Sequence, residues 1–437
     1  MKPSVPTTLP CPVVLNALTK GMPGSMASLA PEEIASQGWN LLREDLNLPA
    51  AVLRQSALEH NSRWMQAFIT SHNGWFSPHG KTTMSPELFT RQLKDGAWAL
   101  TLANAHQVQV ARHFGIKRIF LANQLVGRQA IEYVLHALRD DPAFDFYCLV
   151  DDVEHVRVLA DAASRINIGR PLQVLVELGI PGARSGCRGN EDALAVARAV
   201  HTHAPVLSLR GVEGFEGIIS HPDQTERTRQ VRNFLSDMRA LAEQCDIEQL
   251  YAEGTALLSA GGSAFYDIVL EELSRAKLSR GSAVLTRSGC YLIHDAKKYS
   301  QAHQHLAARV GNRAPGPDGP KAALEVWAYV HSRPEPNRII IGMGKRDISY
   351  DDLPLAQKWY RPSHDRLTQP SNLPDGHEVV RLDDQHAYML VPENSPLKVG
   401  DMVQFGISHP CLTFDKWRAM CLVNDDYDVI GAITTYF

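Results

Sequence analysis

Residues 74–88 read GWFSPHGKTTMSPEL, which places a short apolar run, a turn with one lysine and the start of a helix in direct succession. The apolar run predicts a strand, and the Ser-Pro after the turn is a common helix start. Lys81 is then expected just after the strand ends. From these residues alone an ordinary solvated loop lysine is the simpler interpretation, so the role of Lys81 depends on the rest of the chain.

The alternation of apolar runs and amphipathic stretches continues to about residue 290. Eight runs are candidate strands, at residues 74–79, 97–103, 117–123, 144–150, 172–178, 206–220, 248–254 and 283–289. The runs are continuously apolar, which is typical of parallel strands buried on both faces. Eight such units close a parallel barrel, and no G-x-G-x-x-G follows the first run, which argues against an open dinucleotide-binding sheet. The sequence therefore predicts an α/β fold with a (β/α)8 TIM-type barrel.

The pattern changes after the eighth run. GNRAPGPDGP, residues 311–320, is dense in glycine and proline and predicts a linker or exposed loop. Short apolar runs without long helices follow it and predict a compact β domain. We therefore expect an N-terminal helical extension at residues 1–65, the barrel at 66–310 and a C-terminal β domain at 311–437.

Composition excludes several classes of protein. The formal net charge of -4 gives no general attraction to nucleic acid or anionic lipid. No apolar run reaches the roughly 18 residues of a membrane helix, and the N-terminus lacks a signal-peptide pattern. The seven cysteines are scattered and never in C-x-x-C spacing, which favours a reducing compartment. We expect a cytoplasmic protein that binds neither nucleic acid nor membrane.

In a barrel, functional side chains belong at the C-terminal ends of the strands. Lys81 lies there, and so does Arg184 in the turn GARSG. Gly261, Gly262 and Ser263 open a helix, where backbone N–H groups can bind a phosphate, although such a turn is more often only a helix cap. A lysine and a phosphate seat at one barrel mouth suit pyridoxal phosphate, because the lysine forms a Schiff base and the phosphate anchors the other end.

The order of barrel lysine, G-x-R-x-G turn, GGS turn and β domain resembles the fold type III, alanine racemase-like, pyridoxal phosphate enzymes. PHGKTTMSPEL together with HPCLTFDKWR resembles, within that family, the D-serine dehydratase and D-threonine aldolase branch, and in particular its bacterial D-serine deaminase-like members. The resemblance covers the chain from about residue 65 to the end.

The resemblance implies a role for each matching residue. Lys81 would be the Schiff-base lysine, and Arg184 would contact the phenolic oxygen of the cofactor unless it is a surface-loop arginine. Arg287 matches an arginine that alanine racemases place against the pyridine nitrogen, a position at which this branch varies. The residues that would bind the phosphate are Gly261, Gly262, Ser263, Gly289 and Cys290.

Two histidine segments have weaker signals. His221, in GIISHPD, ends a predicted barrel strand and could act as a catalytic residue facing the cofactor ring, or it could be a hydrogen-bonded structural histidine. Gln385 and His386, in LDDQHAY, resemble a pair that reaches the site from the β domain.

His409 and Cys411 are the predicted metal ligands. In an extended segment, alternate residues point the same way, so an H-x-C sequence presents an imidazole and a thiolate on one side. Nitrogen and sulfur suit zinc, with magnesium or manganese as alternatives. A bare H-x-C is usually a chance occurrence, and its place inside HPCLTFDKWR carries the assignment. Several D-threonine aldolases have aspartate where this chain has Cys411, so the cysteine favours the dehydratase side.

The resemblance implies a lyase that depends on pyridoxal phosphate and a divalent metal and acts on D-configured β-hydroxy amino acids. D-serine dehydratase (deaminase) activity, which gives a keto acid and ammonia, is the first expectation, with the metal stabilising the departing hydroxide. Aldolase cleavage of the D-threonine type, an amino-acid racemase and a non-catalytic pyridoxal phosphate-binding protein are the alternatives. The expected partners are a D-amino acid and a second copy of the chain in a homodimer.

Overall fold

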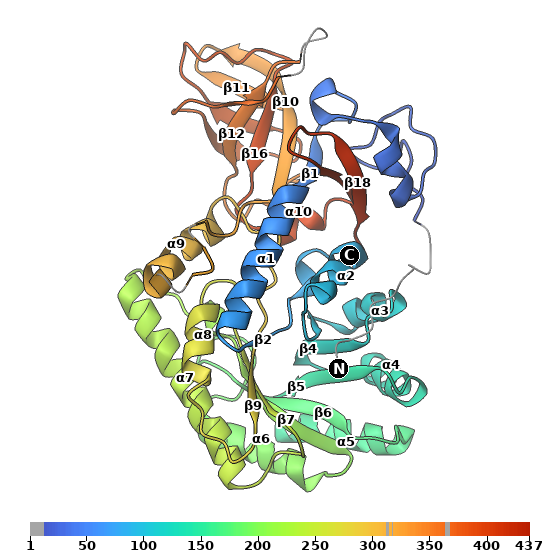
Figure 1. Ribbon diagram of the computed structural model, residues 1–437, viewed down its shortest axis with the longest axis vertical. Helices are drawn as coiled ribbons and strands as arrows, with labels where there is room; N and C mark the ends of the chain where they lie inside the picture. Colours follow the sequence, from blue (N-terminus) through green and yellow to red (C-terminus); the bar gives the residue numbers. More distant parts are fainter. Residues whose placement is uncertain (1–12, 312–313, 317, 363–367) are drawn as a thin grey trace. The chain divides into compact units, whose positions relative to one another are not determined.

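The computed structural model describes residues 13–311, 314–316, 318–362 and 368–437, so predicted features at residues 1–12, 312–313 and 317 lie outside the described residues. The chain forms two compact units (Figure 1). The barrel unit contains, among described residues, 66–81 and 92–289. The β unit contains the remaining described residues, from 13 to 65, 82 to 91 and 290 to 437.

The barrel unit is built on an eight-stranded parallel sheet in the order β2-β9-β8-β7-β6-β5-β4-β3. The strands are β2 (Trp75–Phe76), β3 (Leu100–Leu102), β4 (Arg118–Gln124), β5 (Asp145–Val150), β6 (Leu172–Leu178), β7 (Leu207–Gly214), β8 (Ala256–Ala260) and β9 (Ser282–Thr286). The two ends of this order meet, because the Trp98 amide donates to the Phe76 carbonyl at 2.7 Å and the Thr101 amide donates to the Pro78 carbonyl at 2.9 Å. The predicted parallel barrel is confirmed.

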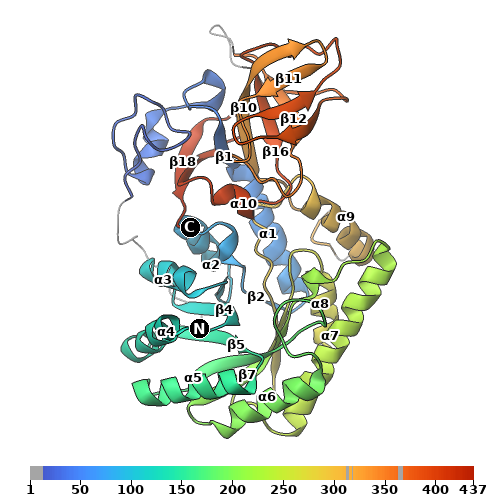
Figure 2. The same cartoon turned by 180° about the vertical axis from the view of Figure 1, so that it is seen from behind.

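Helices follow the strands around the barrel. They are α3 (Ala105–His113), α4 (Arg128–Asp140), α5 (Val153–Ile166), α6 (Asn190–Thr202), α7 (Gln224–Ile247) and α8 (Tyr266–Leu273), whereas α2 (Pro86–Lys94) is divided between the two units. Seen from behind, α3, α4 and α5 lie on one side of the strands and α7 and α8 on the other (Figure 2). Polar N-caps start several of them: the Asp152 carboxylate accepts from the His155 amide at 2.8 Å at the start of α5. Inside, the large side chains Phe120, Tyr147, Leu149, Leu175, Leu257 and Leu285 form a buried cluster.

The seventh barrel strand lies later in the chain than predicted. Residues 248–254 form the turn that follows α7 instead of a strand, because the Leu250 amide donates to the Cys245 carbonyl at 3.0 Å and Gln249 adopts the left-handed φ of 56°. The strand is β8, ALLSA, which is buried along its whole length between β7 and β9. The prediction was wrong although ALLSA has four apolar residues out of five and EQLYAEG only three out of seven.

The β unit contains a ten-stranded sheet whose main order is β13-β12-β16-β10-β1-β17-β18, with β11, β15 and β14 continuing from β10. Its strands are β1 (Ala50–Arg54), β10 (Leu324–Glu335), β11 (Arg338–Ile341), β12 (Leu355–Tyr360), β13 (Ser371–Asn372), β14 (Glu378–Leu382), β15 (Ala387–Leu390), β16 (Met402–Gly406), β17 (Ala419–Val423) and β18 (Val429–Thr434). Its core includes the fully buried Trp327 and Tyr427. The predicted second β domain is confirmed.

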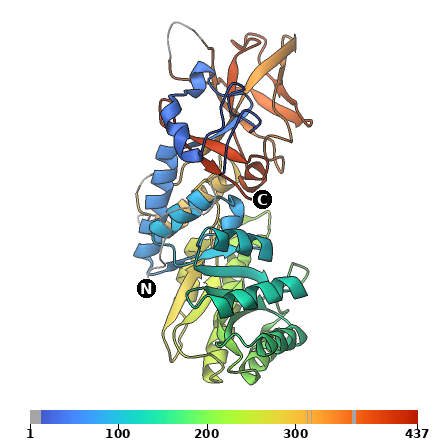
Figure 3. The same cartoon turned by 90° about the vertical axis from the view of Figure 1, so that its right-hand side faces the viewer.

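The boundaries of the two units differ from those predicted. The N-terminal segment is not only helical, because β1 pairs with β10 and β17, and the chain beside β18 forms 3-10 helices η1 (Pro31–Gln37) and η2 (Leu41–Arg43) before α1 (Gln55–Ser71) (Figure 3). Described residues up to 65 therefore belong to the β unit.

The barrel unit ends at residue 289 rather than 310. The Ala296 amide donates to the Ile407 carbonyl at 2.9 Å, which ties the segment before α9 (Lys298–Val310) to the β unit. Within the described part of the chain, no helix combines the length and apolarity needed to cross a bilayer.

Candidate functional site

The predicted cofactor-binding residues of the barrel unit follow the C-terminal ends of parallel strands. Lys81 lies in the 3-10 turn η3 (Gly80–Thr82) after β2, and Arg184 lies in the loop after β6. Gly261 directly follows β8, and Arg287 directly follows β9. Because the ends of parallel strands share one end of a barrel, these residues meet at its mouth.

Arg287 is held in a buried ionic network. Its side chain donates from Nη2 to the Glu213 carboxylate and, at 3.0 Å, to the Gly214 carbonyl, and from Nε to the Ser259 hydroxyl at 3.0 Å. Burial raises the pKa of Glu213 to about 8, against the opposing charge of Arg287. Its second oxygen, Oε2, is buried and has no hydrogen-bond partner among the described atoms. The mouth therefore keeps one buried oxygen without a protein partner.

The glycine turn after β8 binds an oxyanion. The amides of Gly261 and Gly262 each donate at 2.9 Å to one oxygen of Glu216, a fully buried carboxylate in the 3-10 turn η4 (Glu216–Ile218). A Cβ on Gly262 would come within 2.9 Å of the Phe215 ring, so the turn has little room for a side chain. Donation from two adjacent amides to one anion is the chemistry predicted for a phosphate here. A phosphate that used the same two amides would have to displace Glu216.

Two polar groups at the mouth had no predicted role. His79 has an Nδ1 atom without a partner among the described residues, and burial, together with the positive charges of Lys81 and Arg287, holds its pKa well below the ordinary value. Glu177, at the end of β6, accepts from Gln124 at 2.5 Å and from Ser185 at 2.9 Å, and burial raises its pKa. The available signal was a polar residue at the end of an otherwise apolar run.

The weaker histidine candidates make local contacts. The His221 Nδ1 atom accepts from the Asp223 amide at 3.1 Å, in the turn that starts α7. This contact is of the structural kind that was the alternative for His221. His386 is exposed in the hairpin turn between β14 and β15, where its carbonyl accepts from the Asp383 amide at 2.9 Å.

The predicted metal ligands converge within the β unit, together with a third residue. Cys290, His409 and Cys411 offer ligand atoms that all lie within 4.8 Å of one another. The two sulfur atoms are 4.0 Å apart, and the Thr82 hydroxyl oxygen lies 3.6 Å from the Cys411 sulfur. His409 and Cys411 are not in an extended segment as predicted, because Pro410 has α-helical dihedrals and Cys411 begins the short helix α10 (Cys411–Phe414).

Asp351 orients the imidazole of this cluster. Its carboxylate lies 2.6 Å from the Nδ1 atom of His409, which leaves Nε2 available to a metal. Hydrogen bonding to Cys411, and then the Asp351 carboxylate, raise the pKa of His409 to about 9. The hydrogen bond with Cys290, and then His409, lower the pKa of Cys411 to about 4, whereas Cys411 and burial raise that of Cys290. Cys411 is therefore a thiolate at neutral pH, the form that binds metals.

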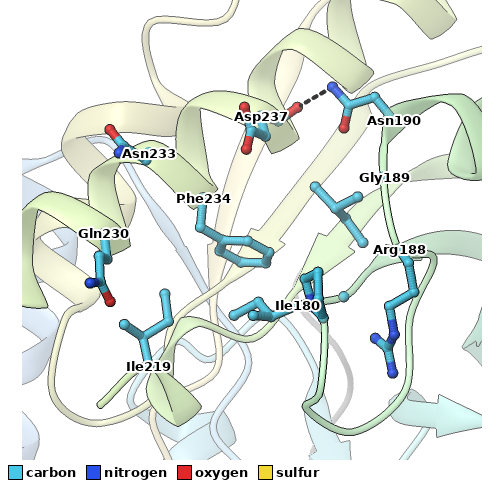
Figure 4. Close-up of a pocket in the computed structure, with 12 residues that line it drawn as sticks. Ile180, Arg188, Gly189, Asn190, Ile219, Gln230, Asn233, Phe234 and Asp237 are labelled. Atoms are coloured by element: carbon cyan, nitrogen blue, oxygen red, sulfur yellow. Dashed lines mark hydrogen bonds between the residues drawn. The ribbon is translucent and has the colours of Figure 1, made fainter. Parts of the chain in front are cut away.

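A separate cavity of about 570 Å³ lies between the loop after β6 and helix α7 (Figure 4). Phe234, Ile180 and Ile219 present apolar side chains to it, and the Asn190 amide donates to the Asp237 carbonyl at 3.1 Å beside it (Figure 4). None of the predicted catalytic, cofactor or metal residues lines this cavity. Its lining includes one carboxylate, Asp237, and none of the three-ligand groups found among the described residues.

Comparison with known proteins gives matches to both units. Residues 323–423, which include His409 and Cys411, match a family described as "Putative serine dehydratase domain". A D-threonine aldolase of Arthrobacter sp. is 26% identical over 395 residues, which covers 90% of this chain and 92% of that protein.

Solved structures share the fold. D-threonine aldolase from Filomicrobium marinum matches with a TM-score of 0.73 at 22% identity, covering 91% of this chain and 97% of that one. D-threo-3-hydroxyaspartate dehydratase from Delftia sp. HT23 matches with a TM-score of 0.67 at 20% identity, covering 91% and 99%. An alanine racemase-like protein from Idiomarina loihiensis matches with a TM-score of 0.65 at 16% identity, covering 89% and 96%. The chain therefore shares the fold of these structures, and in sequence it is similar to D-threonine aldolase over most of its length.

Proposed function

We propose that this chain is a lyase that uses pyridoxal phosphate and a divalent metal ion to act on D-configured β-hydroxy amino acids, with dehydration of D-serine as its first activity. The observation that carries the proposal is the convergence of His409 and Cys411, with Asp351 oriented behind the imidazole. Neither a racemase nor a non-catalytic binding protein needs a metal ion beside its ligand. A lyase that expels hydroxide needs one, because hydroxide is a poor leaving group that a metal ion can stabilise.

The residues at the barrel mouth fit pyridoxal phosphate. Amides of the turn after β8 already donate to an oxyanion, and the buried Oε2 of Glu213 has no partner among the described atoms. Bound there, the cofactor would supply delocalisation of negative charge at the substrate Cα. Lys81 would carry the cofactor and move the proton at that carbon through its Nζ atom. Arg184 and Arg287 would provide positive charge to the cofactor ring.

The donor set in the β unit fits a divalent metal. One imidazole nitrogen and a thiolate of lowered pKa are ligands of the kind zinc prefers. An ion at this position would supply Lewis acidity to the β-hydroxyl group. Thr82, whose hydroxyl lies 3.6 Å from the Cys411 sulfur, is the chain neighbour of Lys81. Under the proposed function, the lysine and the metal ligands act on the same substrate.

Aldolase cleavage is the second candidate, because the relative from Arthrobacter is named a D-threonine aldolase. The two reactions differ in which bond of the β-carbon breaks. In a dehydratase the Cβ–O bond breaks and the oxygen leaves, whereas in an aldolase a base takes the hydroxyl proton and the Cα–Cβ bond breaks. Cys411 favours the first, since aldolases of this branch often have aspartate at that position.

A homodimer in the cytoplasm completes the proposal. Six described cysteines are free thiols, in keeping with a reducing compartment. Gel filtration with light scattering of the active protein tests the assembly, and an active protein that is strictly monomeric would contradict it.

Product analysis tests the activity itself. The purified protein is incubated with D-serine, D-threonine or D-threo-3-hydroxyaspartate, and keto acid, aldehyde and ammonia are measured. Keto acid and ammonia in equal amounts from D-serine are expected, with no product from L-serine. Glycine and an aldehyde from D-threonine would establish the aldolase instead. Conversion of D-serine to L-serine without keto acid would establish a racemase.

A further inference from the structure

We propose that Cys290 is a third protein ligand of the metal ion, so that the site is a Cys2His site with one position left open. The proposal rests on the proposed function, since it takes His409 and Cys411 as metal ligands. The role predicted for Cys290 from the resemblance was a different one, contact with the cofactor phosphate through its backbone amide. The two roles are compatible, because one uses the amide and the other the thiol.

The positions of the two sulfur atoms fit a shared zinc ion. Two thiolates on one tetrahedral zinc, each with a Zn–S bond of about 2.3 Å, lie about 3.8 Å apart. The sulfur atoms of Cys290 and Cys411 are 4.0 Å apart. The imidazole nitrogen of His409 completes a set of three ligand atoms within 4.8 Å, so small shifts would bring all of them to one ion.

The surroundings of the Cys290 side chain also suit a ligand. It is 5% exposed, so the ion would be held away from bulk water on that side. The Thr82 hydroxyl lies 3.8 Å from the Cys290 sulfur and 3.6 Å from that of Cys411, so it is within reach of both thiols. Cys421, also in the β unit, is 2% exposed and lies on β17 with no place in any three-ligand group found among the described residues.

A third ligand changes which metal the site selects. Three protein ligands and one open position are typical of catalytic zinc, in which the open position receives water or substrate. Two thiolates disfavour magnesium and manganese, which prefer oxygen. The chain would therefore hold zinc tightly and lose it slowly to chelators, whereas two ligands alone would exchange metal readily.

The test counts sulfur ligands directly. Zinc-loaded wild-type protein and the Cys290→Ser, Cys290→Ala, Cys411→Ser and Cys421→Ser variants are compared by zinc X-ray absorption, by the sulfur-to-cobalt charge-transfer band of the cobalt forms, and by competition with a coloured chelator. We expect two sulfur scatterers in the wild type and in Cys421→Ser, and one in each single variant of Cys290 or Cys411. Zinc affinity should fall by at least about 10- to 100-fold in both Cys290 variants.

Each outcome has a defined meaning. One sulfur scatterer in the wild type, with zinc affinity unchanged in both Cys290 variants, would overturn the third ligand and leave the proposed function intact. If the wild type and Cys411→Ser both fail to bind zinc, the proposed function would be overturned as well. Because the fold could fail in a variant, circular dichroism of each protein is required to match the wild type. If zinc-free protein under anaerobic, denaturing conditions shows fewer than its seven thiols and the missing pair maps to Cys290 and Cys411, a disulfide would replace the ligand assignment.

Discussion

In the proposed function the chemistry of the barrel unit depends on Lys81, whose position after the first strand is set by the turn Gly80–Thr82. We expect the purified protein to be yellow and borohydride to fix the cofactor on the peptide that contains Lys81. Lys81→Ala should lose the colour, while Lys117→Ala should keep it, because Lys117 pairs with Asp141 at 2.9 Å on a different part of the barrel unit. Peptide mass spectrometry checks the site. A label on another lysine would contradict the proposed cofactor site.

Gly262 is the second residue whose change should be informative. A valine here would push a Cβ to within 2.9 Å of the Phe215 ring and disturb the amide that donates to Glu216. Loss of a hydrogen bond to a charged group costs about 1.5–3 kcal/mol, so cofactor affinity should fall by about 10- to 100-fold. Gly189→Ala is the matched control, because its added Cβ meets nothing within 4 Å. Fluorescence titration of the apoprotein measures both, and equal affinities would count against the glycine turn.

At the scale of elements, most barrel strands could be predicted because burial on both faces leaves continuous apolar runs. The exception was β8: the run ALLSA directly precedes the glycine turn and was not predicted as a strand, whereas the predicted segment 248–254 forms the turn that follows α7. The strand β1 was missed for a different reason. It is stabilised by pairing with β10 and β17, which lie far away in the sequence, so no local sequence pattern predicts it.

The start of α9 contains a pH-sensitive cap. One carboxylate oxygen of Asp295 accepts from the amides of Lys297 and Tyr299 at 3.0 and 2.7 Å, while its other oxygen is buried and has no hydrogen-bond partner among the described atoms. Burial raises the pKa of Asp295 to about 6. The unfolded value is about 4, so between these values the folded state keeps a proton that the unfolded state has lost. The free energy of unfolding should then fall as pH rises from about 4 to 6, by up to about 3 kcal/mol.

Asp295→Asn tests this cap, because asparagine keeps the acceptor and has no charge to bury. We expect the unfolding midpoint of the metal-free variant to depend less on pH between about 4 and 7 than that of the metal-free wild type. Asp352→Asn is the control, since Asp352 is half exposed and pairs with Lys297 at 2.7 Å. Parallel pH profiles for the wild type and Asp295→Asn would show that Asp295 is ionised in the folded protein throughout this range.

At the scale of the whole molecule, the sequence was sufficient to predict the two-unit arrangement and to propose His409 and Cys411 as metal ligands, but not to predict the clusters around them. Cys290 lies between β9 and α9, Cys411 begins α10, and Asp351 is far from His409 in the chain. Only the folded β unit brings these side chains together. Likewise, the contacts of Glu213 with Arg287 and of Glu216 with the glycine turn could not be predicted, because the residues come from the ends of different strands of the folded barrel.

The separation of chemistry between the two units gives the last prediction. Lys81, Arg184 and the glycine turn belong to the barrel unit, whereas His409 and Cys411 belong to the β unit. Removal of the metal by exhaustive chelation should therefore lower elimination from D-serine by at least about 100-fold, since the Lewis acid stabilises the departing hydroxide by several kcal/mol. The cofactor absorbance should remain, because its binding residues are untouched. Exchange of the Cα proton with deuterium from solvent, followed by NMR, should also survive, because Lys81 performs it.

Cys411→Ala should reproduce the effect of chelation, because loss of a thiolate ligand prevents retention of the ion. If His409 and Cys411 only pack in the β unit, Cys411→Ala should be destabilised. The activity of the wild type should then not respond to chelators, and elemental analysis should find no metal. Zinc added back should restore elimination in the chelated wild type and fail to restore it in Cys411→Ala, while Cys421→Ala, with an equally buried cysteine of the same unit, should behave as the wild type. Full activity of a wild-type protein shown to be free of metal would remove the metal from the mechanism, and the racemase alternative would then be the one to test.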